Sequence, residues 1–167
     1  LFFPMNKQDI KSHKINMLGH DKKDCFVGVW VNRNAKRKRP NDVLQAWKEF
    51  LDKTDEKYGK RDSMLIMHTD PYDQEGPNLV ITSEYLGINN NVIFSNSRLE
   101  FDKMNVLYNI SDFCFNISYA EGFGLPTLES MSAGKPIMAV KTGGLSRQVV
   151  DHRDGSENGI AVDVECR

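Results

Sequence analysis

The residues best suited to chemistry lie in the segment EGFGLPTLE, from Glu121 to Glu129. Two glutamates flank a Gly-Phe-Gly turn and a Leu-Pro pair typical of the start of a helix. Glycines let the backbone approach a ligand, and the free amides of a helix N-terminus suit a phosphate. An ionised carboxylate hydrogen-bonds strongly to hydroxyls, so Glu129 could hold a ribose while Glu121 faces a group beyond the phosphates. The segment therefore indicates a nucleotide-sugar site.

The pair of glutamates is weak evidence by itself, because Gly and Pro are ordinary at a strand-to-helix turn. The combination is more specific, since Ser-Ala-Gly-Lys-Pro follows at 132–136 and a glycine pair at 143–144. The glycine pair has two readings that the sequence leaves open. It is either a simple turn or a place where a loop passes close to the ligand.

A basic segment, residues 32–39 (NRNAKRKR), follows the first apolar run and carries five cations in eight positions. One interpretation is a clamp for a diphosphate, with a forked guanidinium and an ammonium in different roles. The other is a solvated basic run or a nuclear-localisation-like patch. Its place at the end of a predicted strand favours anion binding.

The elements that must position these residues alternate between strands and helices. Short apolar runs of this kind suit strands buried on both faces of a parallel sheet. Amphipathic patterns predict helices over 40–52, about 100–110 and 126–133, while 53–62 and 70–78 are expected to be surface connections. Together they predict a doubly wound, Rossmann-like α/β sheet with ligands at the carboxyl ends of its strands. The predicted strands are 25–31, 64–67, 91–94, 113–117, 137–140 and 160–162.

Composition limits the function classes. A length of 167 residues suits one domain, and 22 Lys and Arg against 23 Asp and Glu give no reason to expect nucleic acid as a partner. Three widely spaced cysteines (Cys25, Cys114, Cys166) and four scattered histidines predict neither disulfides nor a zinc site. No apolar stretch reaches the roughly 20 residues that cross a bilayer. We therefore expect a cytoplasmic protein, and the start at Leu1 indicates a fragment.

These motifs resemble the C-terminal, donor-binding half of retaining GT-B glycosyltransferases of family 4 (glycosyl transferases group 1). The resemblance covers about residues 25–162, and the E-x7-E spacing of Glu121 and Glu129 is its most specific part. Arg33 and Lys38 match the family's Arg and Lys after the first strand, and Ser118 also fits. The chain departs from the family pattern in the residues around Arg33 and Lys38, and it has Ser-Arg-Gln at 146–148 where Pro-Glu is common.

The resemblance implies a role for each matching residue. Arg33 and Lys38 would bind the diphosphate, although which of the cations at 36–39 does so is left open. Glu121 would hold the transferred sugar and Glu129 the ribose. Glu121, Arg33 and Lys38 are thus the predicted catalytic residues, with no metal or cofactor. The remaining donor-binding residues are the main chain of Gly122, Phe123 and Gly124, the amides of Leu125 and Thr127, and the loop from Ser95 to Leu99 beside the base.

The predicted reaction transfers a glycosyl group, with retention, from a nucleoside-diphosphate sugar to a glycan, lipid or small-molecule acceptor. Residues 1–24 would lead in from a missing N-terminal domain that holds the acceptor. Residues 25–167 would form a nucleotide-sugar-binding domain, truncated at its C-terminal end and poorly active alone. The full-length protein could lie at the inner face of a membrane. The alternatives are a noncatalytic nucleotide-binding module and a dehydrogenase, although no GxGxxG follows the first strand.

Overall fold

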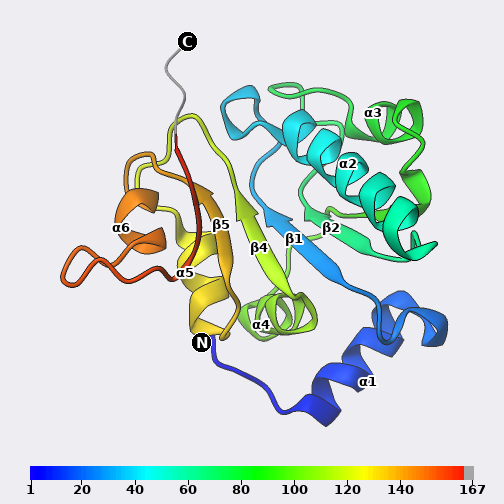
Figure 1. Ribbon diagram of the computed structural model, residues 1–167, viewed down its shortest axis with the longest axis horizontal. Coiled ribbons are helices and arrows are strands. Elements are labelled where there is room, and N and C mark those ends of the chain that lie inside the picture. The colour runs from blue at the N-terminus through cyan, green and yellow to red at the C-terminus, as the bar shows by residue number, and fades with distance from the viewer. Residues whose placement is uncertain (164–167) are drawn as a thin grey trace.

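The computed structural model describes residues 1–163 and contains one six-stranded sheet in which all neighbouring strands are parallel. The strand order is β3-β2-β1-β4-β5-β6, the Rossmann order, in which the direction of winding reverses between β1 and β4 (Figure 1). The predicted fold class is confirmed, and every predicted strand is present within a few residues. The strands are β1 Val27–Val31, β2 Met64–His68, β3 Val92–Ser95, β4 Phe113–Asn116, β5 Ile137–Val140 and β6 Gly159–Val162.

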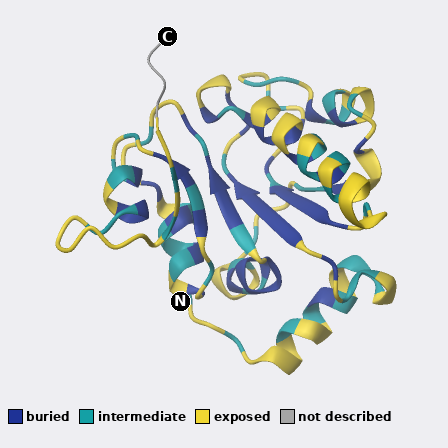
Figure 2. Cartoon of the chain, in the orientation of Figure 1, coloured by how far each residue is buried: buried dark blue, intermediate teal, exposed yellow. Residues whose placement is uncertain are grey.

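Helices cover both faces of the sheet, as a sheet of parallel strands requires. Side chains alternate along β1, so Val27 and Val29 pack toward α4 and α6, whereas Trp30 packs against α2 and α3. The inner strands β1, β2, β4 and β5 are largely buried, whereas the edge strand β6 and the outer helical faces are more exposed (Figure 2). The helices are α1 Lys7–Leu18, α2 Pro40–Tyr58, α3 Leu79–Tyr85, α4 Phe101–Ile110, α5 Leu125–Ser132 and α6 Leu145–Val149, with short 3-10 turns η1 His20–Lys22, η2 Lys36–Lys38 and η3 Asn89–Asn91.

Helix α2 corrects one expectation. It starts at Pro40 as predicted but continues to Tyr58, through much of the segment 53–62 that the charge pattern assigned to a surface connection. Lys and Glu are good helix formers, and an exposed helical face can be wholly charged. The helix ends where Gly59 takes the left-handed conformation, with φ of 62°.

The segment 1–24, expected to be a lead-in, contains helix α1. The Asn6 side chain caps it by accepting a hydrogen bond from the amide of Asp9 (2.9 Å), and the helix packs against α4. Its apolar residues form no clear stripe, so the sequence pattern did not reveal it. Helices α3 and α6, with seven and five residues, were also too short to recognise. The assignment of 1–24 as a link to an N-terminal domain stays a prediction.

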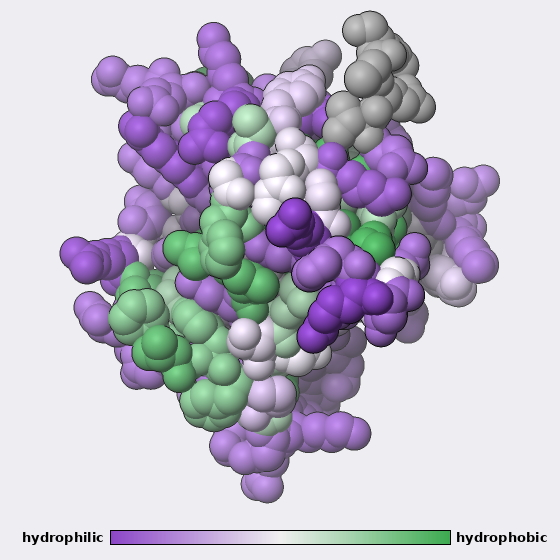
Figure 3. Space-filling view, turned by 90° about the vertical axis from the view of Figure 1, so that its left-hand side faces the viewer, coloured by the Kyte–Doolittle hydropathy of each residue, from purple (hydrophilic) through white to green (hydrophobic). Residues whose placement is uncertain are grey.

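The surface seen from the side of α6 is mostly polar, with one continuous apolar patch in the lower left of the view (Figure 3). Apolar patches with polar borders are surfaces on which another segment or chain can pack. Within residues 1–163, none of the helices combines the length and the apolar character needed to span a bilayer.

Candidate nucleotide-sugar site

Three loops meet at the carboxyl ends of the strands, on both sides of the point where the winding reverses. The β1–α2 loop (32–39) contacts the β4–α5 loop (117–124) through the Tyr119 amide, which donates to the Arg37 carbonyl (2.9 Å). The Arg37 guanidinium donates to the Ala120 carbonyl (3.2 Å), and the Thr142 hydroxyl of the β5–α6 loop (141–144) donates to the Tyr119 carbonyl (3.0 Å). The basic and acidic motifs, which lie about 90 positions apart, therefore form one surface.

Lys38 and Glu121 form the most buried ion pair among the described residues. The Lys38 ammonium donates to the Glu121 carboxylate, and the two side chains are only 7% and 13% exposed. Lys38 is placed there by the short turn η2, which leaves Lys36 and Arg37 exposed. Of the cations at 36–39, Lys38 is thus the one that the structure joins to the Glu121–Glu129 segment.

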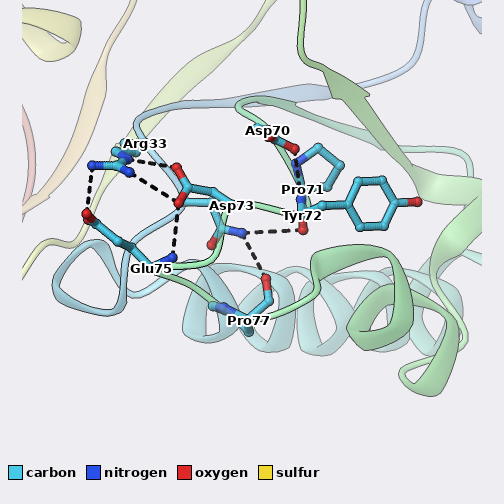
Figure 4. Close-up of polar contacts among 8 residues, drawn as sticks. Arg33, Asp70, Pro71, Tyr72, Asp73, Glu75 and Pro77 are labelled. Carbon is cyan, nitrogen blue, oxygen red and sulfur yellow. Dashed lines mark hydrogen bonds and ion pairs between the residues drawn. The ribbon is translucent and has the colours of Figure 1, made fainter.

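Arg33 lies in a different environment, shown in Figure 4. Its guanidinium makes two hydrogen bonds to Asp73 (2.7 and 3.3 Å) and an ion pair with Glu75 (2.9 Å). Hydrogen bonding to Arg33 lowers the pKa of Asp73, and that same bond raises the pKa of Arg33. The Arg33 side chain is 59% exposed, so the two N–H groups not used in these contacts can still reach a phosphate.

The β2–α3 loop (69–78) that supplies Asp73 is itself fixed to the β1–α2 loop. The Asn34 side-chain amide donates to the Pro77 carbonyl (2.8 Å), and the Lys36 amide donates to the Glu75 carbonyl (3.2 Å). Gly76 is required by this contact, because a Cβ there would lie 2.0 Å from the Asn34 side-chain oxygen. The two loops therefore hold Arg33 in a defined orientation.

Glu129 lies in the second turn of α5 and accepts a hydrogen bond from the Tyr108 hydroxyl of α4 (2.7 Å). Tyr108 is completely buried, whereas Glu129 is half-buried. Burial, together with the charge of the Glu129 carboxylate, raises the pKa of Tyr108 far above its ordinary value. The hydroxyl thus remains a donor, and the carboxylate stays within reach of a ligand.

Buried side chains hydrogen-bond to the backbone at the start of α5. Gly124 takes the left-handed conformation (φ 83°), and the buried Thr127 hydroxyl donates to its carbonyl (2.7 Å). The Gln148 side-chain oxygen shares this single hydroxyl proton of Thr127, and the Gln148 side-chain amide donates to the Phe123 carbonyl. The amides of Leu125 and Thr127 lie in the first turn, where a helix provides no acceptor for them. Phe123 and Leu125 are 62% and 60% exposed, whereas Thr127 is completely buried.

The structure shows what the glycine pair packs against, while its closeness to a ligand stays a prediction. A Cβ on Gly143, whose φ is 50°, would lie 1.8 Å from the Glu121 carbonyl oxygen, and one on Gly144 would lie 2.6 Å from that of Phe123. The Gly144 amide donates to the Gly122 carbonyl (3.1 Å). The pair is therefore packed directly against the backbone beside Glu121. A hollow of about 520 Å³ opens there, lined by Gly122, Phe123, Leu128, Gly143, Gly144, Arg147 and Gln148.

Only part of the predicted base-binding loop, residues 95–99, lies at the carboxyl edge of the sheet. Ser95 ends β3, and its hydroxyl lies 3.0 Å from Nδ1 of His68 at the end of β2. Burial lowers the pKa of His68. Leu99 packs toward the core beside α4 and lines a groove of about 410 Å³ with His13 and Met17. The structure thus places Ser95 at the carboxyl edge but turns Leu99 toward α1 and α4.

Neither thiol among the described cysteines has a place in this site. Cys25 and Cys114 are buried and free, and burial raises the pKa of Cys114 to about 12. Cys166 lies outside the described residues. Within residues 1–163, no group of three or more His, Cys, Asp or Glu side chains is arranged to hold a metal ion.

The sequence patterns did not predict several residues of the site. Tyr108 belonged to a predicted apolar stripe, and only its hydroxyl hinted at a polar role. Gln148 was noted solely as a departure from the family pattern, and Asp73 lay in a segment assigned to surface connections. The side-chain nitrogens of Asn32 and Asn116, at the ends of the adjacent strands β1 and β4, are buried without a protein acceptor in the described part of the chain. They are two further donors at the same edge.

The family described as glycosyl transferases group 1 matches residues 13–165. The chain is 30% identical over 159 residues to alpha-1,3/1,6-mannosyltransferase ALG2 of Dictyostelium discoideum, covering 90% of this chain and 37% of that protein. It is 32% identical over 146 residues to D-inositol 3-phosphate glycosyltransferase of Corynebacterium diphtheriae, covering 86% and 31%. The chain therefore spans about a third of the length of these relatives.

Solved structures share the fold. Anabaena Alr3699/HepE, in complex with UDP and glucose, superposes with a TM-score of 0.74 at 20% identity, covering 98% of this chain and 40% of that one. The C-terminal domain of a glycosyl transferase group 1 family protein (LpcC) from Francisella tularensis gives 0.67 at 23% identity, covering 98% and 78%. With the family match over 13–165, these findings show that the chain belongs to the glycosyl transferases group 1 and has the Rossmann-like fold of the C-terminal half of a GT-B enzyme.

Proposed function

We propose that this chain is the donor-binding domain of a retaining family 4 glycosyltransferase. It binds a nucleoside-diphosphate sugar, and the full-length enzyme transfers the glycosyl group to an acceptor held by an N-terminal domain. One observation carries the proposal. The fold brings Lys38 into contact with Glu121 at the reversal of the winding, in the segment that continues into the first turn of α5 and on to Glu129. That is where sheets of this topology bind their ligands.

Each part of the donor has a chemically suited partner at this edge. The exposed Arg33 and the amides of Leu125 and Thr127 suit a diphosphate, because they combine a guanidinium with a helix N-terminus. The Glu129 carboxylate suits the ribose hydroxyls. Glu121 and the main chain of 122–124 would contact the transferred sugar.

The ion pair of Lys38 and Glu121 resolves an electrostatic conflict. A carboxylate beside a diphosphate would repel it, but Lys38 neutralises Glu121 at contact distance. Glu121 can therefore accept hydrogen bonds from sugar hydroxyls without opposing donor binding. Its ion pair favours a positioning role over that of a covalent nucleophile.

During transfer, the bond between the anomeric carbon and the diphosphate oxygen breaks, and negative charge grows on the departing group. Cationic Arg33 and Lys38 and the helix amides would stabilise this charge in a preorganised site. The acceptor hydroxyl then attacks from the face that the diphosphate leaves and gives its proton to the departing diphosphate oxygen, so the anomeric configuration is retained. We propose that these groups suffice without a metal ion. An inverted anomeric product of the full-length enzyme would refute the retaining assignment.

The relatives bear on the substrate class. Alr3699/HepE was solved with UDP and with UDP-glucose, and the two curated relatives are named as a mannosyltransferase and a D-inositol 3-phosphate glycosyltransferase. These names support a nucleotide-linked hexose as the donor. The proposed location is the cytoplasm, at the inner face of a membrane when the acceptor is a lipid.

A thermal-shift panel of UDP, GDP, ADP and their sugars tests donor binding by the chain itself. At about 100 times Kd a ligand adds about 2.7 kcal/mol, which raises Tm by about 5–10 °C for a chain of this size. We expect one base to give this shift and Glu129→Ala to abolish it. Flat responses to all of these compounds at millimolar concentration would contradict donor binding.

The noncatalytic alternative requires a separate test. A binding module would show the same thermal shift, whereas the full-length protein would neither transfer nor hydrolyse a sugar from the donor that binds. The intact Glu121–Lys38 pair favours the enzyme, because a module that only binds nucleotide has no need of a polar group directed at the sugar.

A further inference from the structure

Tyr108 lies behind the candidate site, where neither the motif nor the resemblance assigns it a role. It belongs to α4, is completely buried, and donates its hydroxyl proton to Oε2 of Glu129 at 2.7 Å. A tyrosine this deep in a core normally serves packing. Here its one polar atom instead reaches the carboxylate at the edge of the donor site.

The ring of Tyr108 packs against the N-terminal segment of the chain. The ring of Phe2 packs edge-on against Tyr108, with centroids 5.7 Å apart and planes at 75°. The N-terminal segment that carries Phe2 is itself fixed to α4, because the Phe3 amide donates to Asn105 (3.0 Å) and the Met5 amide donates to Asn109 (2.9 Å). Residues upstream of α1 therefore help to fix the position of the Tyr108 ring.

This geometry limits what Glu129 can do. A carboxylate has two oxygens and about four acceptor positions, and Tyr108 occupies one position on Oε2. The bond restricts rotation of the carboxylate and leaves Oε1 and the remaining position on Oε2 for a ligand. A carboxylate fixed in this way presents two adjacent acceptors, which matches two neighbouring hydroxyls better than a single one.

We propose that Tyr108 is a positioning residue that orients the Glu129 carboxylate toward the vicinal hydroxyls of the donor's ribose, and that it thereby sets the preference of the site for ribonucleotides. The inference rests on the proposed function, since it assumes that Glu129 meets a ribose. It goes further by assigning the discrimination between ribose and deoxyribose to a contact between α4 and α5.

Isothermal titration tests this with the nucleoside diphosphate that binds best and with its 2′,3′-dideoxy counterpart. For the wild type we expect the dideoxy compound to bind more weakly. Tyr108→Phe keeps the ring and its packing and removes only the hydroxyl. It should weaken binding of the ribonucleotide by about tenfold, the usual effect of one hydrogen bond to a charged group, and leave the dideoxy compound unchanged.

Two controls separate positioning from general damage. Tyr85→Phe removes a hydroxyl from a side chain on α3 that is 88% exposed, and it should alter neither affinity. In a Glu129→Ala background, Tyr108→Phe should have no further effect, because the group that it orients is gone. Circular dichroism of each variant verifies the fold.

The outcomes divide cleanly. If Tyr108→Phe weakens the binding of both nucleotides equally, Tyr108 has only a structural role. If it weakens the binding of neither, the hydrogen bond to Glu129 does not affect binding. Either result overturns the inference while the proposed function stands. If the wild type binds the ribonucleotide and the dideoxy nucleotide equally, Glu129 does not contact the ribose hydroxyls, and the inference fails. A wild type that binds no nucleoside diphosphate would overturn the proposed function and this inference with it.

Discussion

The two sides of the candidate site are built by different physical means. On the β1 side, Arg33 is 59% exposed and is held by the carboxylates of a surface loop. On the β4 side, the Glu121–Glu129 segment is anchored by buried groups, with Lys38 at one glutamate and Tyr108 at the other. Exposed ion pairs contribute little to stability and are screened by salt, whereas buried polar contacts are costly to break.

This difference separates the two tasks of such a site. The buried side fixes geometry, and its residues should affect folding and binding together. The exposed side supplies charge that is accessible to a diphosphate, so its residues should affect binding with little effect on folding. Variants on each side, measured for both the free energy of unfolding and the affinity for nucleotide, can therefore test this difference between the two sides.

The largest effect on stability is expected from Lys38→Ala, which leaves the Glu121 carboxylate buried without its cation. Removing one partner of a buried pair costs about 3–5 kcal/mol, measured as the free energy of unfolding in urea. Lys48→Ala, which breaks the less buried pair with Asp52 on α2 (side chains 33% and 40% exposed), is the control and should cost less. The double variant Lys38→Met with Glu121→Gln should recover most of the loss. Similar small losses for both alanine variants would contradict the buried character of this side.

Gly143→Ala should destabilise the protein by about 2–3 kcal/mol, because left-handed strain is added to a clash with the Glu121 carbonyl. Gly59→Ala has a similar φ of 62° but meets nothing within 4 Å, so it should cost only about 1 kcal/mol. Urea unfolding of the two variants isolates the clash. Nucleotide affinity should fall for Gly143→Ala alone, and equal losses of stability would show that the glycine pair is only a turn.

Arg33→Ala should weaken nucleoside diphosphate binding by about tenfold to a hundredfold, since a charge-assisted contact is lost. The urea midpoint should hardly move, because the side chain is exposed. Arg153→Ala is the control, as it also removes an exposed arginine that pairs with a loop aspartate, Asp151, in the α6–β6 connection. High salt should reduce the effect of Arg33→Ala. A loss of stability without a loss of affinity would reverse the roles assigned to the two sides.

The smallest effect concerns pH and His68, whose pKa is lowered in the folded protein by burial. The unfolded chain therefore takes up the proton first, at about pH 6.5, so stability should fall as pH drops below that value toward the folded pKa. Above this window the histidine is neutral in both states and has no effect. Urea midpoints between pH 7.5 and 5 should fall less for His68→Gln than for the wild type. Identical pH profiles would show that the ring is solvated.

Much of the fold followed from local patterns, because each strand is a short apolar run and α2, α4 and α5 have amphipathic stripes or clear start signals. Helix α1 could not be found this way, since its stability comes from packing on α4 and from its Asn6 cap. In the site, the strand-end position of Lys38 and Glu121 predicted a shared surface. Their direct pairing was not predictable, because it depends on the turn η2, and the bond from Tyr108 to Glu129 depends on how α4 packs against α5.

A crystal structure of the chain with the nucleoside diphosphate that binds best tests the central claim most directly. We predict that the diphosphate lies between Arg33 and the amides of Leu125 and Thr127, with the ribose hydroxyls hydrogen-bonded to Glu129 and the bond from Tyr108 retained. A nucleotide bound away from the reversal of the winding, with Glu129 contacting only Tyr108, would contradict the account.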